Sequence, residues 1–351
     1  MKIKDLVRQN ILSLKPYTSA RDIYESSEGI LLDANENSWG STFNEIDSLN
    51  LNRYPDPHQN DLKDLVGNYY SIAAENLFFG VGSDEIIDLI IRIFCEPNAD
   101  KVIIPGPTYG MYKVACDINN VETIQVLLND DFQINVDAIE KKYNKNVKII
   151  FLCSPNNPTG NLLNKKDVLT LCKSFNSIII VDEAYIDFSI EGTLIDEIKN
   201  YPNLIILRTF SKAWGLAGIR LGYCISNPDI IEFLFKVKAP YNISSLTRFA
   251  LKSALKNSGL KNSFVKSIIK ERNRLWNQLE SLTGVIHVYK SDANFLLVKF
   301  DDPNYVQKKL AGKGIIVRNR SSQSKLSGCL RISIGNEEEN DILWDEIKRI
   351  F

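Results

Sequence analysis

The chain has 351 residues, of which 44% are hydrophobic and 24% charged, which is usual for a globular protein with a sizeable core. A formal net charge of −1 excludes the global basic field that gathers nucleic acid or anionic lipid. No apolar run approaches the ~20 residues of a membrane helix, and the N-terminus lacks a signal-peptide core, so we expect a cytoplasmic protein. Six scattered cysteines without a CxxC pair are expected to be reduced, and with only two histidines no metal centre is expected.

Short apolar runs alternate with helix-length segments through the middle of the chain. The sequence predicts strands at 101–105, 122–127, 147–153, 177–183, 203–209 and 221–226. Helices are predicted at 84–95, 109–118, 135–143 and 165–175. Strands that are apolar on both sides and alternate with helices indicate an α/β fold, in which helices flank both faces of a mostly parallel sheet.

The pattern changes after about residue 240. Residues 246–282 are predicted to form one long helix, followed by four short strands and a final amphipathic helix. These segments predict a second, smaller α+β domain. We therefore expect an N-terminal arm and part of the small domain at 1–45, a large domain at 46–245, and the small C-terminal domain at 246–351.

Polar residues follow several strands of the predicted sheet, where ligands bind in open α/β folds. Ser83 and Asp84 open a helix after "LFFG", and either bind an anion at the helix N-terminus or simply cap it. Tyr109 follows "VIIPGPT" and either stacks on a flat ligand or fills the core. Asn157, in "SPNNPTG", offers an amide or belongs to a plain turn.

The segment "DEAY" ends an otherwise apolar strand with two acids. A carboxylate at the end of a buried strand is costly unless a cationic or protonated partner meets it. Asp182 and Glu183 are therefore both candidates for a ligand contact, with Tyr185 three residues after Asp182. A helix cap or a surface ion pair is the structural alternative.

The segment "RTFSKAWGLAGIRLGY" places Lys212 in a short loop between strands. A desolvated lysine has a lowered pKa, and its amine then attacks carbonyl compounds, although most lysines are solvated surface charges. Thr209, Ser211 and Arg220 supply hydroxyls and a guanidinium suited to phosphate. Together, these strand ends offer what pyridoxal 5′-phosphate requires: a reactive lysine, a phosphate cup, a stacking ring and an isolated acid.

The motif order "NNPTG … DEAY … TFSKAWGLAGIRLGY" resembles the fold-type-I, pyridoxal-phosphate-dependent aminotransferases of class II. The segments "PYTSAR", "RYPDP" and "SGCLRIS" are more narrowly similar to the histidinol-phosphate aminotransferase family. The resemblance runs nearly end to end. It implies a large domain with a mostly parallel sheet and a smaller α+β domain.

The resemblance implies a role for each motif residue. Lys212 would bind the cofactor aldehyde covalently and shuttle the substrate proton, and Asp182 would pair with the pyridine nitrogen. Asn157 and Tyr185 would contact the phenolate oxygen, and Tyr109 would stack on the ring. The phosphate would be held by Ser83, Asp84, Thr209, Ser211 and Arg220.

The remaining implied roles concern the substrate and a partner subunit. Arg331 and Arg318, with Arg320 as substitute or helper for Arg318, would bind the substrate carboxylate or phosphate. Tyr17 and Asn35 would line the substrate pocket. Tyr54 would reach the cofactor phosphate of the neighbouring subunit, which implies a homodimer.

The implied reaction is a ping-pong transamination between L-histidinol phosphate and 2-oxoglutarate in histidine biosynthesis. Two alternatives on the same scaffold stay open: decarboxylation of threonine phosphate and a broader aromatic aminotransferase. The segment "NENSWG" departs from the family pattern at Ser38 and Trp39, which leaves fine substrate preference open.

Overall fold

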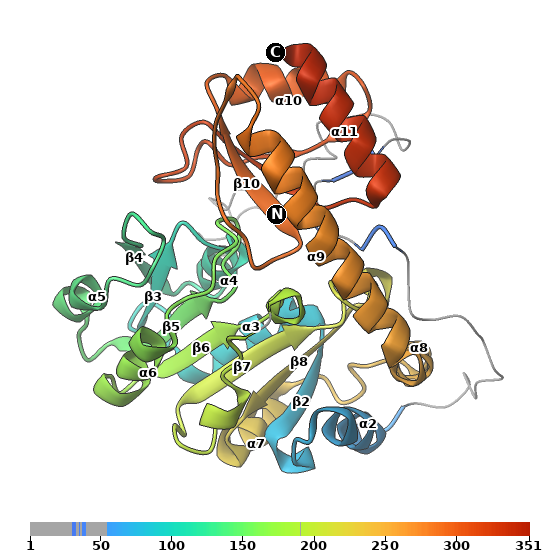
Figure 1. The fold of residues 1–351 in the computed structure, drawn as a ribbon. Helices are drawn as coiled ribbons and strands as arrows, with labels where there is room; N and C mark the ends of the chain where they lie inside the picture. Colours follow the sequence, from blue (N-terminus) through green and yellow to red (C-terminus); the bar gives the residue numbers. More distant parts are fainter. Residues whose placement is uncertain (1–29, 33–34, 36, 40–54, 190) are drawn as a thin grey trace, which may run out of the picture.

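The computed structural model describes residues 30–32, 35, 37–39, 55–189 and 191–351. Figure 1 shows a larger unit built on one wide sheet and a smaller unit above it, with the long helix α9 (Ser258–Glu280) running along both. Tyr17 and Tyr54 lie outside the described residues. No helix in these ranges is long and apolar enough to cross a membrane.

The larger unit is organised around a seven-stranded sheet with the order β2-β8-β7-β6-β5-β3-β4. The strands are β2 (Leu77–Val81), β3 (Lys101–Gly106), β4 (Glu122–Leu127), β5 (Val147–Cys153), β6 (Ile178–Asp182), β7 (Leu204–Thr209) and β8 (Leu221–Ser226). Neighbours from β4 to β7 pair in parallel, whereas β8 is antiparallel to both β7 and β2. The prediction of a mostly parallel sheet is confirmed.

This topology gathers chain segments at one edge of the sheet. Because β8 is antiparallel to β7, the start of β8 lies beside the end of β7, and Thr209 pairs with Gly222. Because β2 is antiparallel to β8, its final residue Val81 pairs with Leu221, the first residue of β8. The turns after β2 and before β8 therefore join the loops that follow β3, β5, β6 and β7.

Helices cover both faces of the sheet because its strands are apolar on both sides. In β6, Ile179 and Val181 belong to the hydrophobic cluster on one face, while Ile180 belongs to the cluster on the other. The helices are α2 (Asn60–Tyr70), α3 (Gly82–Phe94), α4 (Met111–Ile118), α5 (Val136–Lys142), α6 (Lys165–Ser174), α7 (Pro228–Val237) and α8 (Ser245–Lys256).

The smaller unit has a four-stranded antiparallel sheet with the order β12-β13-β10-β9. Its strands are β9 (Val285–Val288), β10 (Phe295–Phe300), β12 (Arg318–Asn319) and β13 (Cys329–Ser333). A separate pair joins β1 (Ile30–Leu31) to β11 (Ile315–Ile316) in parallel. Helices α9, α10 (Pro303–Ala311) and α11 (Glu337–Ile350) complete this unit. The pairing of β1 with β11 ties the N-terminal part of the chain to the smaller unit.

The predicted single helix over 246–282 is wrong, because the structure contains two helices that meet at Asn257. Asn257 has φ −99° and ψ 28°, which leaves the helical region and ends α8. Helix α8 contacts α2, and its Leu251 and Ala254 belong to the core of the large sheet. Helix α9 instead contacts β9 and β10. The predicted domain limits at residues 45 and 245 stay a proposal.

The six cysteines of the chain all fall within the described part. Each is buried, and none forms a disulfide. Burial raises the pKa of the thiols of Cys95 and Cys172 to about 12, because the apolar interior disfavours the thiolate. These cysteines therefore act as small core residues.

Candidate functional site

Two adjacent acids at the end of β6 point in opposite directions, as alternation along a strand requires. The Glu183 carboxylate accepts hydrogen bonds from Arg208 at 2.8 and 3.1 Å and from Thr193 at 3.0 Å. Arg208 and Glu183 are both buried, so this ion pair belongs to the framework behind the site. Asp182 is left as the acid that faces the loops at the sheet edge.

Asp182 is 3% exposed. Its carboxylate accepts a hydrogen bond from the Tyr112 hydroxyl at 2.7 Å and one from the Ala184 backbone N–H at 3.1 Å. Burial raises the pKa of Asp182 to about 6, and these two hydrogen bonds oppose that rise. Because burial disfavours the charged carboxylate, a protonated ligand group is a suitable partner for it.

A chain of hydrogen bonds links Tyr185, Asn157 and Arg331 across the two units. The side-chain amide of Asn157 donates to the Tyr185 hydroxyl at 3.1 Å, and its oxygen accepts from Arg331 at 2.7 Å. The side-chain amide of Asn35 also donates to Tyr185, at 3.2 Å. All four residues are buried. Burial raises the pKa of Tyr185 to about 12, while the positive charge of Arg331 opposes the rise.

Lys212 lies in the loop between β7 and β8 and is half-buried. Its Nζ lies 5.9 Å from the centroid of the Tyr185 ring. The loop is held by the Ala213 carbonyl, which accepts from the side-chain amide of Asn37 at 3.3 Å, and by Trp214, which is buried in the core. The amine is therefore held near the Tyr185 ring in a half-buried loop, and it does not lie on a solvent-exposed helix.

The turn from β2 into α3 forms a tight backbone cradle. Gly82 has φ +73°, and a Cβ there would lie 2.6 Å from Nη2 of Arg220. A Cβ on Gly222 would lie 2.4 Å from the backbone nitrogen of Ser83. Only glycine allows both approaches. The first N–H groups of α3 and the Arg220 guanidinium are thus brought to one place, which suits a phosphate.

The other residues predicted for this cup lie beside it. Thr209 donates to the Ser211 hydroxyl at 3.0 Å. Asp84 accepts from the Tyr109 hydroxyl at 3.2 Å and lies 3.4 Å from Nη2 of Arg220. Tyr109 packs edge-to-face on Tyr112 with ring centroids 5.4 Å apart. The hydroxyls, the ring and the guanidinium therefore belong to one continuous site.

The two predicted substrate arginines lie on adjacent strands of the small sheet. Arg318 of β12 and Arg331 of β13 are direct register partners, so their side chains project from the same face. Arg331 is 4% exposed, and its guanidinium lies 5.3 Å from the Phe295 ring centroid. The backbone N–H of Arg320 pairs with the Cys329 carbonyl at 2.9 Å. Like charges directly opposite each other are destabilising, and an anion bound between them would offset the cost.

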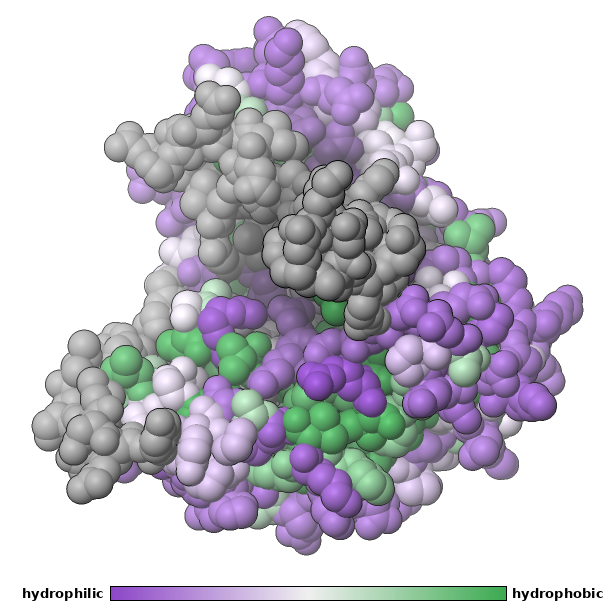
Figure 2. Space-filling view, turned by 180° about the vertical axis from the view of Figure 1, so that it is seen from behind, coloured by the Kyte–Doolittle hydropathy of each residue, from purple (hydrophilic) through white to green (hydrophobic). Residues whose placement is uncertain are grey.

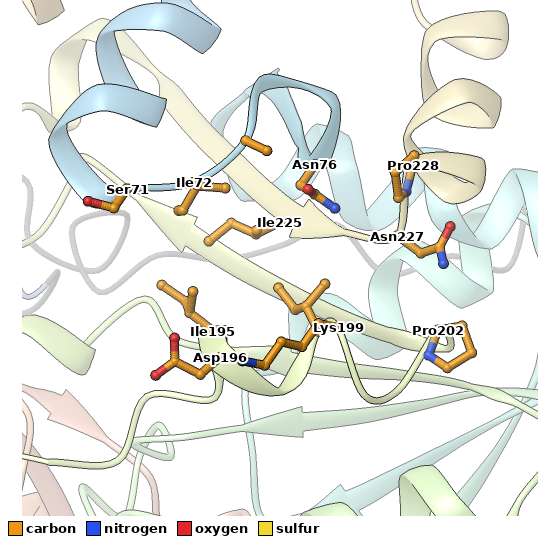
Figure 3. Close-up of a pocket in the computed structure, with 12 residues that line it drawn as sticks. Ser71, Ile72, Asn76, Ile195, Asp196, Lys199, Pro202, Ile225, Asn227 and Pro228 are labelled. Carbon is orange, nitrogen blue, oxygen red and sulfur yellow. The ribbon is translucent and has the colours of Figure 1, made fainter.

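A separate cavity of about 290 Å³ lies at the other edge of the large sheet. Figure 3 shows its lining, which includes Ile72, Asn76, Lys199, Ile225 and Asn227. It borders the end of β8, where Ser226 pairs with Ile205 near the start of β7. The cavity is therefore distinct from the site, which lies at the carboxyl ends of the parallel strands.

Sequence reasoning missed two residues of the site. Tyr112 reads as the apolar face of a helix, and its edge-to-face contact with Tyr109, which lies in the loop before α4, comes from the fold. Ser333 donates to the Asn35 side-chain oxygen at 2.7 Å and accepts from its backbone N–H at 3.0 Å. The two residues are 298 positions apart, so no local pattern indicates this contact.

Comparisons with known proteins identify the family of the chain. A family model for aminotransferase class I and II matches residues 27–347. The chain is 45% identical over 348 residues to histidinol-phosphate aminotransferase from Parabacteroides distasonis, a match that covers 99% of each chain.

Two solved structures share the fold. Histidinol-phosphate aminotransferase from Clostridium acetobutylicum has a TM-score of 0.80 at 28% identity, over 86% of this chain and 91% of that chain. The enzyme from Sinorhizobium meliloti, in complex with pyridoxal-5′-phosphate, has a TM-score of 0.87 at 22% identity, over 98% and 97%. The predicted fold-type-I architecture is confirmed. The chain belongs to the class I and II aminotransferase family and, within it, to the histidinol-phosphate aminotransferases.

Proposed function

We propose that this protein transfers the amino group of L-histidinol phosphate to 2-oxoglutarate, giving imidazole acetol phosphate and L-glutamate, with pyridoxal 5′-phosphate as cofactor. The observation that carries the proposal is the buried Asp182 carboxylate at one sheet edge with Lys212, the phosphate cradle and Arg331. The full-length identity of 45% to a histidinol-phosphate aminotransferase supports the choice of reaction. The step belongs to histidine biosynthesis.

When bound, pyridoxal 5′-phosphate supplies an aldehyde that condenses with amines and a pyridinium ring that withdraws electrons from the reacting carbon. Asp182 would hold the proton on the pyridine nitrogen, since a buried carboxylate is stabilised by a cation. Lys212 would hold the cofactor between turnovers, and its Nζ would then move the proton at the substrate Cα.

Several residues would hold the cofactor in place. Asn157 and Tyr185 would donate hydrogen bonds to the phenolate oxygen, and the Tyr109 ring would stack on the pyridine. The phosphate would be held by the cradle of Ser83 and Asp84 with Thr209, Ser211 and Arg220. Holding the phosphate and the ring nitrogen at opposite ends fixes the orientation of the ring, so that the amine of Lys212 meets only the aldehyde carbon.

The arginine pair would recognise the anionic groups of both substrates. A guanidinium matches carboxylate and phosphate geometry equally well, so one site can accept glutamate and histidinol phosphate in turn. We assign the substrate anion to Arg331, with Arg318 assisting, and Asn35 to the pocket wall beside Tyr185. Replacing Arg318 and Arg320 separately with glutamine would decide which of them assists: the loss in kcat/KM for histidinol phosphate should follow Arg318.

We propose that the active form is a homodimer. Three large apolar side chains near the phosphate cradle are exposed: Val81 at 42%, Tyr241 at 47% and Leu246 at 53%. Their neighbours tie them to the cradle, since Asn242 donates to Glu85 of α3 and Thr247 donates to the Ile219 carbonyl. Figure 2 shows hydrophobic surface gathered on the rear face of the larger unit. Sedimentation of Leu246→Lys should show dissociation to monomers, and a dimer of unchanged stability would contradict the proposal.

The reaction is tested by the visible absorbance of the purified protein. Adding L-histidinol phosphate should bleach the absorbance, and adding 2-oxoglutarate should restore it. The restoration identifies amino-group transfer, because in a decarboxylation the amino group leaves with the product and none stays on the cofactor for 2-oxoglutarate to accept. Carbon dioxide release from threonine phosphate, without any transfer of amine, would overturn the proposed reaction. Equal rates with phenylalanine would indicate the broader aromatic aminotransferase.

A further inference from the structure

Tyr112 is a fully buried tyrosine of α4 whose hydroxyl has a specific acceptor. Its ring stacks on Phe151 with centroids 4.6 Å apart and planes 6° apart. Its hydroxyl donates to Asp182 at 2.7 Å. A phenylalanine would make the same stacking contact, and burying a hydroxyl costs free energy unless it is hydrogen-bonded. Packing against Phe151 therefore does not explain why this position carries a tyrosine hydroxyl.

The acceptor of this hydrogen bond, Asp182, lies in an environment that disfavours its ionised form. Asp182 is buried, and the nearby carboxylates of Asp84 and Glu183 both disfavour its ionised form. Two hydrogen bonds favour the ionised form: Tyr112 donates to Oδ2, and the backbone N–H of Ala184 donates to Oδ1. With one donor on each oxygen, the plane of the carboxylate is fixed. Tyr112 is the side-chain member of this pair of donors.

We propose that Tyr112 is a positioning residue that orients the Asp182 carboxylate and keeps it ionised, so that it can hold the proton on the cofactor's pyridine nitrogen. The inference rests on the proposed pairing of Asp182 with that nitrogen. The geometry of Tyr112 itself does not depend on the cofactor. Tyr112 touches neither substrate nor cofactor in this assignment and acts only through Asp182.

The first test uses the full chain without cofactor. The pH dependence of unfolding is measured for the natural sequence and for Tyr112→Phe, each with and without Asp182→Asn. Tyr112→Phe should raise the pH midpoint of the Asp182 transition by about one unit, because a hydrogen bond to the charged form is lost. In the Asp182→Asn background the shift should vanish. An unchanged midpoint would overturn the proposal, because a purely structural role lowers stability equally at every pH.

The second test measures the dissociation constant of pyridoxal 5′-phosphate. Tyr112→Phe should weaken binding about tenfold, since an uncompensated buried carboxylate is a poorer partner for the ring nitrogen. The matched control is Tyr143→Phe, which also removes a hydroxyl contact, the one to Ser177 at 3.3 Å, and should leave binding unchanged. Equal affinities for Tyr112→Phe and the natural sequence would also overturn the proposal. Failure of the natural sequence to bind the cofactor would instead refute the proposed function.

Discussion

The buried Asp182 carboxylate makes the cofactor-free protein less stable at neutral pH. The perturbation that reveals this is Asp182→Asn, which keeps the shape of the side chain and removes its charge. Burial holds the pKa of Asp182 at about 6 in the folded chain, against an ordinary value of 3.8. Such a carboxyl group stabilises the fold fully below pH 3.8, and this contribution is lost as the pH rises through 6.

The shift in pKa sets the size of the effect. A difference of about 2 units corresponds to about 3 kcal/mol of stability lost between acid and neutral pH. Between pH 5 and pH 8 the loss is about 1.4 kcal/mol, because part of the transition already lies below pH 5. The difference in unfolding free energy between Asp182→Asn and the natural sequence should therefore grow by about this amount across that range.

The assay is urea unfolding of the two cofactor-free proteins, followed by tryptophan fluorescence at several pH values. Groups that do not interact with Asp182 titrate alike in both proteins, so they cancel in the difference. A difference that stays constant from pH 5 to pH 8 would refute the reasoning, because the carboxyl group would then have the same pKa in the folded and unfolded chains.

Three further predictions follow from the site and the framework behind it. Lys212→Ala should abolish turnover while the cofactor still binds reversibly, because the phosphate cradle and Asp182 remain; dialysis followed by absorbance separates the two effects. Arg208→Met should cost about 3–5 kcal/mol in urea unfolding, because it leaves the Glu183 carboxylate buried without its partner; a loss below about 1 kcal/mol would contradict a buried pair. Gly222→Ala should weaken cofactor binding, measured by fluorescence titration, because its Cβ would lie 2.4 Å from the backbone nitrogen of Ser83.

Local patterns predicted the large sheet because most of its strands are apolar runs, although β4 carries Glu122, Thr123 and Gln125. They also predicted that Asp182 and Lys212 share one edge, since both follow strands that end there. The sequence did not distinguish the roles of Asp182 and Glu183, because the two acids are adjacent and only the position of Arg208 separates them. That separation depends on β6 and β7 lying side by side, which no single segment encodes.

The substrate-binding arginines could not be predicted from local patterns either, because their pairing also depends on how strands come together. Arg331 reads as one more charge on a strand, and Arg318 as part of a basic cluster. Their register pairing arises from the folding of β12 onto β13, across the nine residues from 320 to 328. Only the resemblance to a known family implied that both arginines bind the substrate. The break between α8 and α9 at Asn257 was missed because the helical pattern continues on both sides of it.

The side-chain amide of Asn157 joins two chemically different parts of the molecule. Its oxygen accepts a hydrogen bond from the guanidinium of Arg331, and its nitrogen donates one to the hydroxyl of Tyr185. Successive hydrogen bonds polarise one another, so neutralising the guanidinium weakens the donor at the far end of the amide. We therefore expect a carboxylate that binds Arg331 to weaken the hydrogen bond from Asn157 to the Tyr185 oxygen. An amine without an anionic group should leave this bond unchanged.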